Sequence, residues 1–118
     1  MSATPTAWVR VCAAEDLEEG EGKAFDTNPP IAVFLTNGEL FCIDDTCTHE
    51  KWSLGDGWVD GCQVECTLHM ARFDLRTGNP LSPPASRPVR THDIRMENGA
   101  VLVQLPETYH HQFPEVAA

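Results

Sequence analysis

The chain has 118 residues and an ordinary apolar content of 42%, which suits one globular domain with its own core and excludes a disordered chain. The formal charge is −10, and the eight Lys and Arg residues are too few for the basic patch that nucleic acid requires. No apolar run approaches the roughly 18 residues that cross a membrane, and residues 1–8 lack the features of a secretory signal. We therefore expect a cytoplasmic protein with neither a nucleic-acid nor a membrane partner.

Strand patterns dominate the chain. Apolar residues alternate roughly by two over Trp8–Ala13, which predicts a strand, and residues 22–26 form a weaker candidate. Residues 13–19 could form one acidic turn at most. No stretch has a sustained helical period, so the fold class is predicted to be all-β.

Two hairpins are predicted from Asn-Gly pairs. Apolar runs at residues 31–35 and 40–43 flank Asn37-Gly38, and both turn residues tolerate a positive φ. The same arrangement returns near the C-terminus, with runs at residues 93–96 and 100–103 around Asn98-Gly99.

The segment between the hairpins is rich in turns, with short strands expected at residues 63–65 and 72–75. We expect antiparallel sheets with a loop-rich subdomain inserted in their middle. We predict a single domain over residues 1–118, with the inserted subdomain at about 44–86 and a basal β framework at about 8–43 and 87–106. The tail at 107–118 is expected to be frayed or loosely packed.

The cysteine count is odd, at five, which does not suit a secreted disulfide scaffold. Cys12 and Cys42 lie in apolar runs and are expected to be small buried hydrophobes. Cys62 lies in a predicted turn, Asp60-Gly61-Cys62, and is assigned no role.

The remaining cysteines form a metal-ligand pattern: Cys47-Thr48-His49, then sixteen residues, then Cys66-Thr67-Leu68-His69. Two Cys and two His suit either one tetrahedral zinc ion or a 2Fe-2S cluster in which both Cys bind one iron and both His bind the other. Zinc sites usually pair Cys with Cys and His with His, whereas here each loop supplies one ligand of each type. The spacing therefore favours the cluster. His92, His110 and His111 lack partners at ligand spacing and are expected at the surface.

These motifs resemble the Rieske family, most closely the small ferredoxins of bacterial aromatic-ring-hydroxylating dioxygenases of the biphenyl and toluene type. The resemblance is carried by the two ligand motifs and by residues 52–57, 64–70, 72–78 and 82–84. It implies a Rieske fold, an antiparallel β sandwich with a cluster-binding subdomain, and one 2Fe-2S cluster held by Cys47, His49, Cys66 and His69.

The resemblance also implies a role. The protein would be a one-electron carrier in aromatic hydrocarbon catabolism, from an NAD(P)H-dependent flavoprotein ferredoxin reductase to a terminal oxygenase. It would not be an enzyme and would have no small-molecule substrate of its own. Pro83 and Pro84 would cover one side of the cluster, while Trp52 and Met70 would form a packing shell or a rim for partners.

A low reduction potential follows from comparison with high-potential Rieske proteins. Those proteins have an extra disulfide-forming Cys in each ligand loop, where this chain has Trp52 and Leu68. They also have Ser and Tyr hydroxyls after the second His, where this chain has Ala71 and Phe73. Without these donors the reduced cluster is less stabilised, which predicts a potential near the bottom of the Rieske range, roughly −150 mV.

Two alternatives remain at this point. One is a Rieske-like small subunit of an assimilatory reductase, such as nitrite reductase. The other is an interaction module stabilised by zinc.

Overall fold

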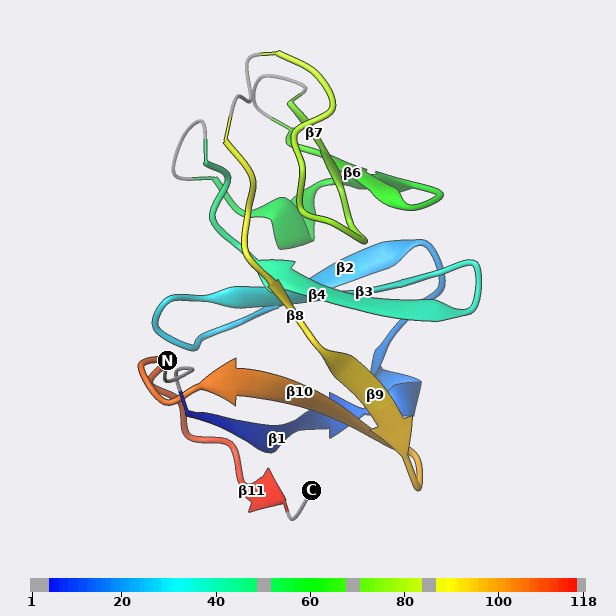
Figure 1. The fold of residues 1–118 in the computed structure, drawn as a ribbon. Coiled ribbons are helices and arrows are strands. Elements are labelled where there is room, and N and C mark those ends of the chain that lie inside the picture. The colour runs from blue at the N-terminus through cyan, green and yellow to red at the C-terminus, as the bar shows by residue number, and fades with distance from the viewer. Residues whose placement is uncertain (1–4, 49–51, 68–70, 84–86, 117–118) are drawn as a thin grey trace.

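The computed structural model describes residues 5–48, 52–67, 71–83 and 87–116 (Figure 1). The strands are β1 (Thr6–Ala13), β2 (Glu21–Phe25), β3 (Ile31–Thr36), β4 (Glu39–Asp44), β5 (Trp58–Asp60), β6 (Gln63–Glu65), β7 (Arg72–Asp74), β8 (Thr91–His92), β9 (Ile94–Glu97), β10 (Ala100–Pro106) and β11 (Glu115–Val116). Two short 3-10 turns, η1 (Ala14–Asp16) and η2 (Leu54–Asp56), complete the described elements. The prediction of an all-β fold is confirmed.

The described strands form three antiparallel sheets stacked as layers (Figure 1). The lower sheet has the order β11-β1-β10-β9, the middle sheet β2-β3-β4-β8, and the upper sheet β5-β6-β7. The upper sheet falls inside the range predicted for the inserted subdomain. No helix in the described ranges is long and apolar enough to span a membrane.

The middle sheet is buried on both faces. Along β3, Ile31 and Val33 pack into the core shared with the lower sheet, while Ala32 and Phe34 pack into the core shared with the upper layer. Successive strand residues point to opposite faces, so an unbroken apolar run is what a sheet covered on both sides requires. The apolar run at residues 31–35 therefore serves two cores at once.

Both predicted hairpins are present with the expected turn chemistry. Asn37 and Gly38 have φ values of 53° and 74°, and Asn98 and Gly99 have values of 52° and 77°. The flanking residues pair directly, Thr36 with Glu39 and Glu97 with Ala100. Positive φ at both central residues of a two-residue loop matches the twist of the strands that the loop joins.

The chain leaves the middle sheet at the end of β4 and returns to it at β8. The Asp44 backbone N–H donates to the Arg90 carbonyl over 2.9 Å, and Cys42 and Ile43 pair with His92 and Thr91. The segment that contains the ligand motifs therefore starts and ends at one place on the framework.

The tail prediction is wrong for residues 107–116. β11 pairs with the edge of β1, and Tyr109 is buried with only 4% of its surface exposed. The placement of His92 at the surface is also wrong, because its ring is buried against Asp44. The pairing of β11 with β1 and the contact of His92 with Asp44 both join residues far apart in the chain. Local sequence patterns do not reveal such long-range contacts.

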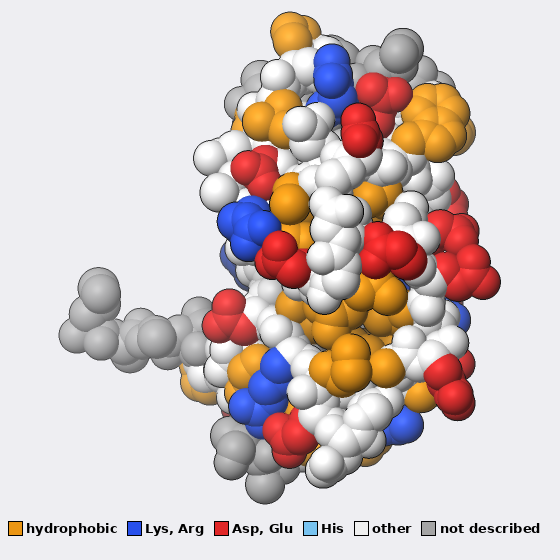
Figure 2. All heavy atoms as spheres, turned by 90° about the vertical axis from the view of Figure 1, so that its right-hand side faces the viewer, with side chains coloured by type: hydrophobic (Ala, Val, Ile, Leu, Met, Phe, Trp, Pro, Cys, Tyr) orange, Lys and Arg blue, Asp and Glu red, His pale blue; other side chains and the backbone are white. Residues whose placement is uncertain are grey.

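Figure 2 shows acidic side chains beside exposed apolar ones on the side that carries the β3–β4 and β5–β6 turns. The described residues with large exposed apolar side chains are Trp52, Trp58, Leu81 and Met96.

Candidate metal centre

Two loops with matching backbone closure carry the two predicted cysteine ligands. The Cys47 N–H donates to the Trp52 carbonyl over 2.9 Å, and the Cys66 N–H donates to the Ala71 carbonyl over 2.7 Å. In each loop the cysteine amide therefore bonds to the fifth residue that follows it. This closure fixes the start of both loops in the same way.

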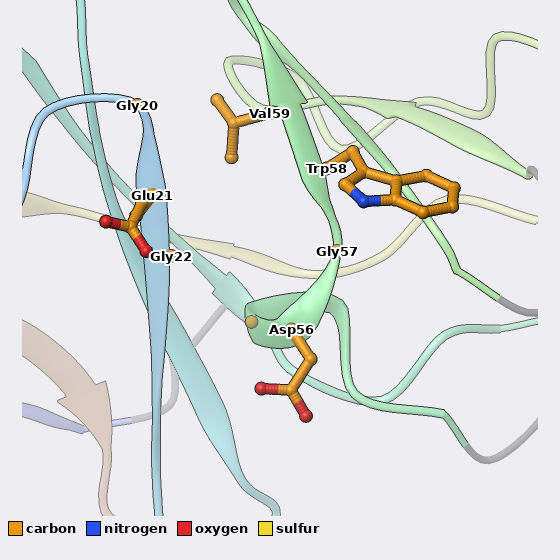
Figure 3. A pocket seen from close by; sticks show the side chains of 8 residues that line it. Gly20, Glu21, Gly22, Asp56, Gly57, Trp58 and Val59 are labelled. Carbon is orange, nitrogen blue, oxygen red and sulfur yellow. The ribbon is translucent and has the colours of Figure 1, made fainter.

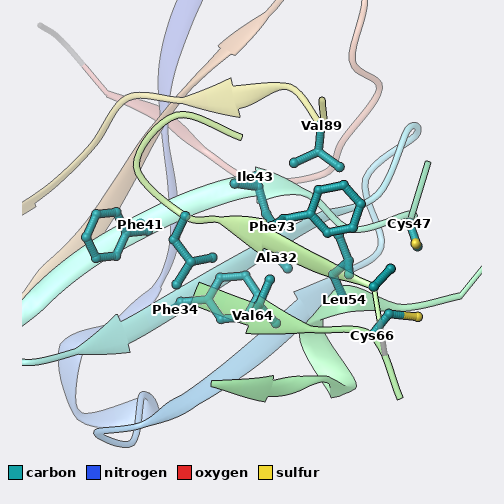
Figure 4. Packing of buried hydrophobic residues seen from close by; sticks show 12 residues of the cluster. Ala32, Phe34, Phe41, Ile43, Cys47, Leu54, Val64, Cys66, Phe73 and Val89 are labelled. Carbon is teal, nitrogen blue, oxygen red and sulfur yellow. The ribbon is translucent and has the colours of Figure 1, made fainter. Parts of the chain in front are cut away.

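Both cysteines are buried at the edge of the upper core. Cys47 is 3% exposed and Cys66 is 2% exposed, and they share an apolar cluster with Leu54, Ala71 and Phe73. Figure 4 shows the two thiols at the same edge of this cluster. All five cysteines lie in the described ranges and none is in a disulfide. A pair of buried thiols from two loops suits a soft metal centre shielded from water.

The structure brings together only part of the predicted site. His49 and His69 lie outside the described residues, as do Met70 and Pro84. Pro83 is exposed, at the end of a described segment. Within the described residues no group of three or more metal-ligating side chains is gathered.

A side-chain hydrogen bond links the two loops. The Trp52 indole Nε1 donates to Thr67 Oγ1 over 2.6 Å, although the indole is 44% exposed. The first loop is also tied to the segment after Pro83, because Thr48 Oγ1 donates to the Arg87 carbonyl over 2.7 Å. The Arg87 guanidinium in turn donates to the Thr48 carbonyl over 3.2 Å. Three segments around the cysteines are thus fixed relative to one another.

Asp45 supports the first loop from below. Its Oδ1 accepts from the Ser53 hydroxyl over 2.8 Å and from the Gly55 N–H over 2.7 Å. Its backbone carbonyl accepts from the Leu54 N–H over 2.7 Å. Burial raises the pKa of this carboxyl, while the Gly55 and Ser53 hydrogen bonds act to lower it. Asp45 directly follows β4. It therefore holds residues 53–55, which follow the first ligand loop, against the end of that strand.

A second carboxylate joins the tail to the base of this region. Asp44 Oδ1 accepts from the Tyr109 hydroxyl over 2.7 Å and lies 2.8 Å from His92 Nε2. The His92 and Tyr109 rings meet edge to face, with centroids 5.1 Å apart. β4, β8 and the C-terminal segment are thereby tied at one point. Sequence reasoning missed these residues, since no ligand-type spacing connects them.

Of the four positions compared with high-potential Rieske proteins, Trp52, Ala71 and Phe73 are described, and Leu68 lies outside the described residues. Ala71 and Phe73 are both fully buried in the upper core, where neither carries a hydroxyl. The indole N–H of Trp52 donates its hydrogen bond to Thr67.

The comparisons with known proteins decide the family. The model of the Rieske [2Fe-2S] domain matches residues 7–93. The chain belongs to the Rieske [2Fe-2S] family. It is 42% identical over 100 residues to the ferredoxin component of biphenyl 2,3-dioxygenase from Rhodococcus jostii, covering 84% of this chain and 94% of that protein.

Two further comparisons agree. The ferredoxin subunit of 3-phenylpropionate/cinnamic acid dioxygenase from Escherichia coli K12 is 40% identical, with the same coverage of 84% and 94%. A structure of carbazole 1,9a-dioxygenase, described as a complex of reduced oxygenase and oxidised ferredoxin, matches with a TM-score of 0.78 and 33% identity. That match covers 82% of this chain and 92% of the other.

Family membership settles the cofactor and the general role. The protein is a Rieske ferredoxin that carries a 2Fe-2S cluster and transfers electrons, and it is not itself a catalyst. Membership of this family rules out the alternative of an interaction module stabilised by zinc. Structures named as nitrite reductase small subunits share the fold, with TM-scores of 0.71 and 0.74, but at 17% and 21% identity they show the fold alone.

Proposed function

We propose that Cys47, His49, Cys66 and His69 hold the cluster. The observation that carries this proposal is the pair of loops closed identically at Cys47 and Cys66, with both thiols at one edge of one apolar core. A Rieske centre takes one Cys and one His from each of two loops, with both thiolates on the same iron.

When bound, the cluster would supply one-electron reduction and oxidation. The surrounding residues hold the ligands in place. Leu54, Ala71 and Phe73 exclude water from the thiol side, while the Trp52–Thr67 bond keeps the two loops together. A rigid site lowers the reorganisation free energy that accompanies the gain or loss of an electron.

The protein works between two others in this proposal. It accepts single electrons from an NAD(P)H-dependent flavoprotein reductase and delivers them in the cytoplasm to the terminal oxygenase of an aromatic-ring-hydroxylating dioxygenase. The support is the 40% and 42% identity to ferredoxin components of two such systems. It is further supported by the structural match to a ferredoxin described in complex with its oxygenase.

Ligand substitution tests the site. Cys66→Ser should abolish the visible absorption and the EPR signal of the dithionite-reduced protein, with loss of bound iron and sulfide. Cys62→Ser is the matched control, because Cys62 lies in the same layer but outside the proposed ligands. A Cys66→Ser protein with the wild-type iron content and EPR signal would contradict the assignment.

Reconstitution tests the role. The reductase and oxygenase of a biphenyl-type dioxygenase are mixed with NADH and an aromatic substrate, with and without this protein. Product formation should depend on the ferredoxin concentration and saturate. Turnover no faster with the protein than without it would reject the proposed pathway while leaving the cluster assignment intact.

A further inference from the structure

Arg87 is held against the first ligand loop by two hydrogen bonds that run in opposite directions. Its guanidinium Nη2 donates to the Thr48 carbonyl over 3.2 Å, and its own backbone carbonyl accepts from Thr48 Oγ1 over 2.7 Å. The Thr48 carbonyl belongs to the peptide bond that leads into His49, one of the proposed ligands. Arg87 therefore restrains this peptide and brings a positive charge to it.

The backbone of Arg87 is anchored, so its side chain starts from a fixed point. Val89 follows two residues later, is 4% exposed and packs in the same apolar cluster as Cys47 (Figure 4). The Val89 N–H donates to the Gly78 carbonyl over 2.9 Å. Gly78 has a φ of 78°, and a Cβ at this position would collide with the Val89 carbonyl, so glycine is required for this close approach.

The described partner of the Arg87 guanidinium is a backbone carbonyl and not a carboxylate. Three other guanidinium groups in the described ranges are paired with carboxylates: Arg72 with Glu65, Arg76 with Glu39, and Arg95 with Glu97. No described carboxylate forms such a pair with Arg87. A neutral carbonyl orients the guanidinium without cancelling its charge, so this charge acts on its surroundings.

The cleft between β2 and β5 has charges of the opposite sign. It has a volume of about 450 Å³, and the charged side chains that line it are those of Glu21 and Asp56 (Figure 3). The whole chain has a net charge of −10, with only eight Lys and Arg residues. Carboxylates disfavour the addition of an electron to a nearby centre, whereas a cation favours it. Arg87 is thus one of the few groups in this protein whose charge favours reduction.

The charge of the cluster changes with its oxidation state. With two thiolate and two neutral imidazole ligands, a 2Fe-2S cluster has no net charge when oxidised and a charge of −1 when reduced. A fixed cation lowers the free energy of the more negative state, and this raises the reduction potential. We propose that Arg87 is a positioning residue for the first ligand loop and that its charge raises the potential of the cluster. The inference rests on the proposed function, because it requires His49 to bind the cluster.

Redox titration of holoprotein variants tests the charge. Arg87→Gln keeps an N–H donor but removes the charge, and should shift the equilibrium by about threefold towards the oxidised form, which at 59 mV per tenfold change lowers the midpoint potential by about 28 mV. Arg87→Lys keeps the charge and should stay close to the wild-type potential. Arg10→Gln is the control, because it removes the same charge from β1 in the lower sheet and should leave the potential unchanged.

Ionic strength gives a second readout. Arg87 is exposed, so salt should screen its charge. The difference in potential between wild type and Arg87→Gln should be largest at about 0.01 M salt and shrink towards about 1 M, because the Debye length falls from about 30 Å to about 3 Å. Arg87→Met, which keeps the aliphatic length of the side chain without its charge, takes its place if Arg87→Gln loses the cluster.

Variants of Thr48 test the positioning role separately. Thr48→Val removes the hydroxyl that bonds to the Arg87 carbonyl but keeps the carbonyl that the guanidinium contacts. Loss of iron to a chelator should therefore become about fivefold faster, as for the loss of one hydrogen bond, whereas the potential should change little. Thr48→Ser keeps the hydroxyl and should behave as wild type.

Three results would overturn the inference: equal potentials for Arg87→Gln and Arg10→Gln, a potential of Arg87→Lys as low as that of Arg87→Gln, or loss of iron from Thr48→Val at the wild-type rate. A raised KM for the oxygenase at an unchanged potential would instead assign Arg87 to partner docking and reject the tuning role. The titrations use the ferredoxin alone, so a failed reconstitution would count only against the proposed pathway. An unshifted potential in an Arg87→Gln protein with the wild-type EPR signal would reject this inference and leave the ligand assignment intact.

Discussion

The indole of Trp52 and the hydroxyl of Thr67 join the two ligand loops, over 2.6 Å between Nε1 and Oγ1. The bond connects residues fifteen positions apart. Thr67 directly follows Cys66, and the Trp52 carbonyl accepts from the Cys47 N–H. It restrains the separation of the loops at their exposed side.

Removing this link should shorten the lifetime of the cluster. Trp52→Phe keeps an aromatic ring but loses the donor, so the loops should open more often and the visible absorption should decay faster in air or chelator. Global stability should change by only about 1 kcal/mol, as expected for one exposed hydrogen bond. Trp58→Phe, at another exposed tryptophan of this layer, is the control. An unchanged rate of cluster loss in Trp52→Phe would show that the link has no such role.

The midpoint potential should be low, roughly −150 mV, at the bottom of the Rieske range. Phe73→Tyr introduces a hydroxyl at a buried position of the upper core and should raise the potential, because a donor near the sulfurs stabilises the reduced cluster. Phe41→Tyr is the control, since Figure 4 shows Phe41 at the opposite edge of the same cluster. Redox titration followed by EPR measures both, and a wild-type value above about +100 mV would refute the argument.

Tyr109 should stabilise the protein although it lies beyond residues 7–93, where the family model matches. Tyr109→Phe removes the hydroxyl that bonds to Asp44 and should lower the free energy of unfolding by about 2 kcal/mol, as for a bond to a charged group. Urea denaturation measures the change. His110→Ala, at the exposed neighbour, should have little effect.

The same tyrosine should make stability sensitive to alkali. Burial first, and then the hydrogen bond to Asp44, raise the pKa of Tyr109 above its ordinary value of 10.0. A pKa raised by folding means that this contribution is complete below the unfolded value and is lost as the pH rises above it. The unfolding free energies of wild type and Tyr109→Phe should therefore differ at neutral pH and converge above about pH 10. A difference that stays constant with pH would contradict the linkage.

Two variants of Asp45 should separate hydrogen bonding from charge. Asp45→Asn keeps an acceptor oxygen for Ser53 and Gly55, so the loop should hold and the cluster should be retained. Asp45→Ala leaves the buried Gly55 N–H without this acceptor and should cost about 2 kcal/mol or more, with reduced iron content after purification. Equal iron content and stability in both variants would show that Asp45 does not position the loop.

Local sequence was sufficient for the elements whose geometry is set locally. The Asn37-Gly38 and Asn98-Gly99 turns were predicted because the residues themselves favour the required φ values. The run at residues 31–35 also predicted its strand, since it is apolar on both faces. Cys12 and Cys42 are buried as expected, at 8% and 2% exposure.

Long-range pairings were not accessible in the same way. β8 and β11 are only two residues long, too short for an alternating pattern. The bond from Tyr109 to Asp44 spans 65 positions, and the contact of His92 with Asp44 spans 48. At the candidate site the spacing of Cys and His indicated the ligands, but the Trp52–Thr67 link depends on how the two loops meet.

The return of the chain to its own point of departure gives the fold a modular character. Asp44 and Arg90 are hydrogen-bonded neighbours, so the loops between them can change in length without moving the point at which the chain leaves and rejoins the middle sheet. The reduction potential and the choice of partner can therefore change through substitutions within the segment between β4 and β8. The framework beneath would need to keep the pairing of β4 with β8 and the apolar upper face of the middle sheet, which carries Ala32, Phe34, Phe41 and Ile43.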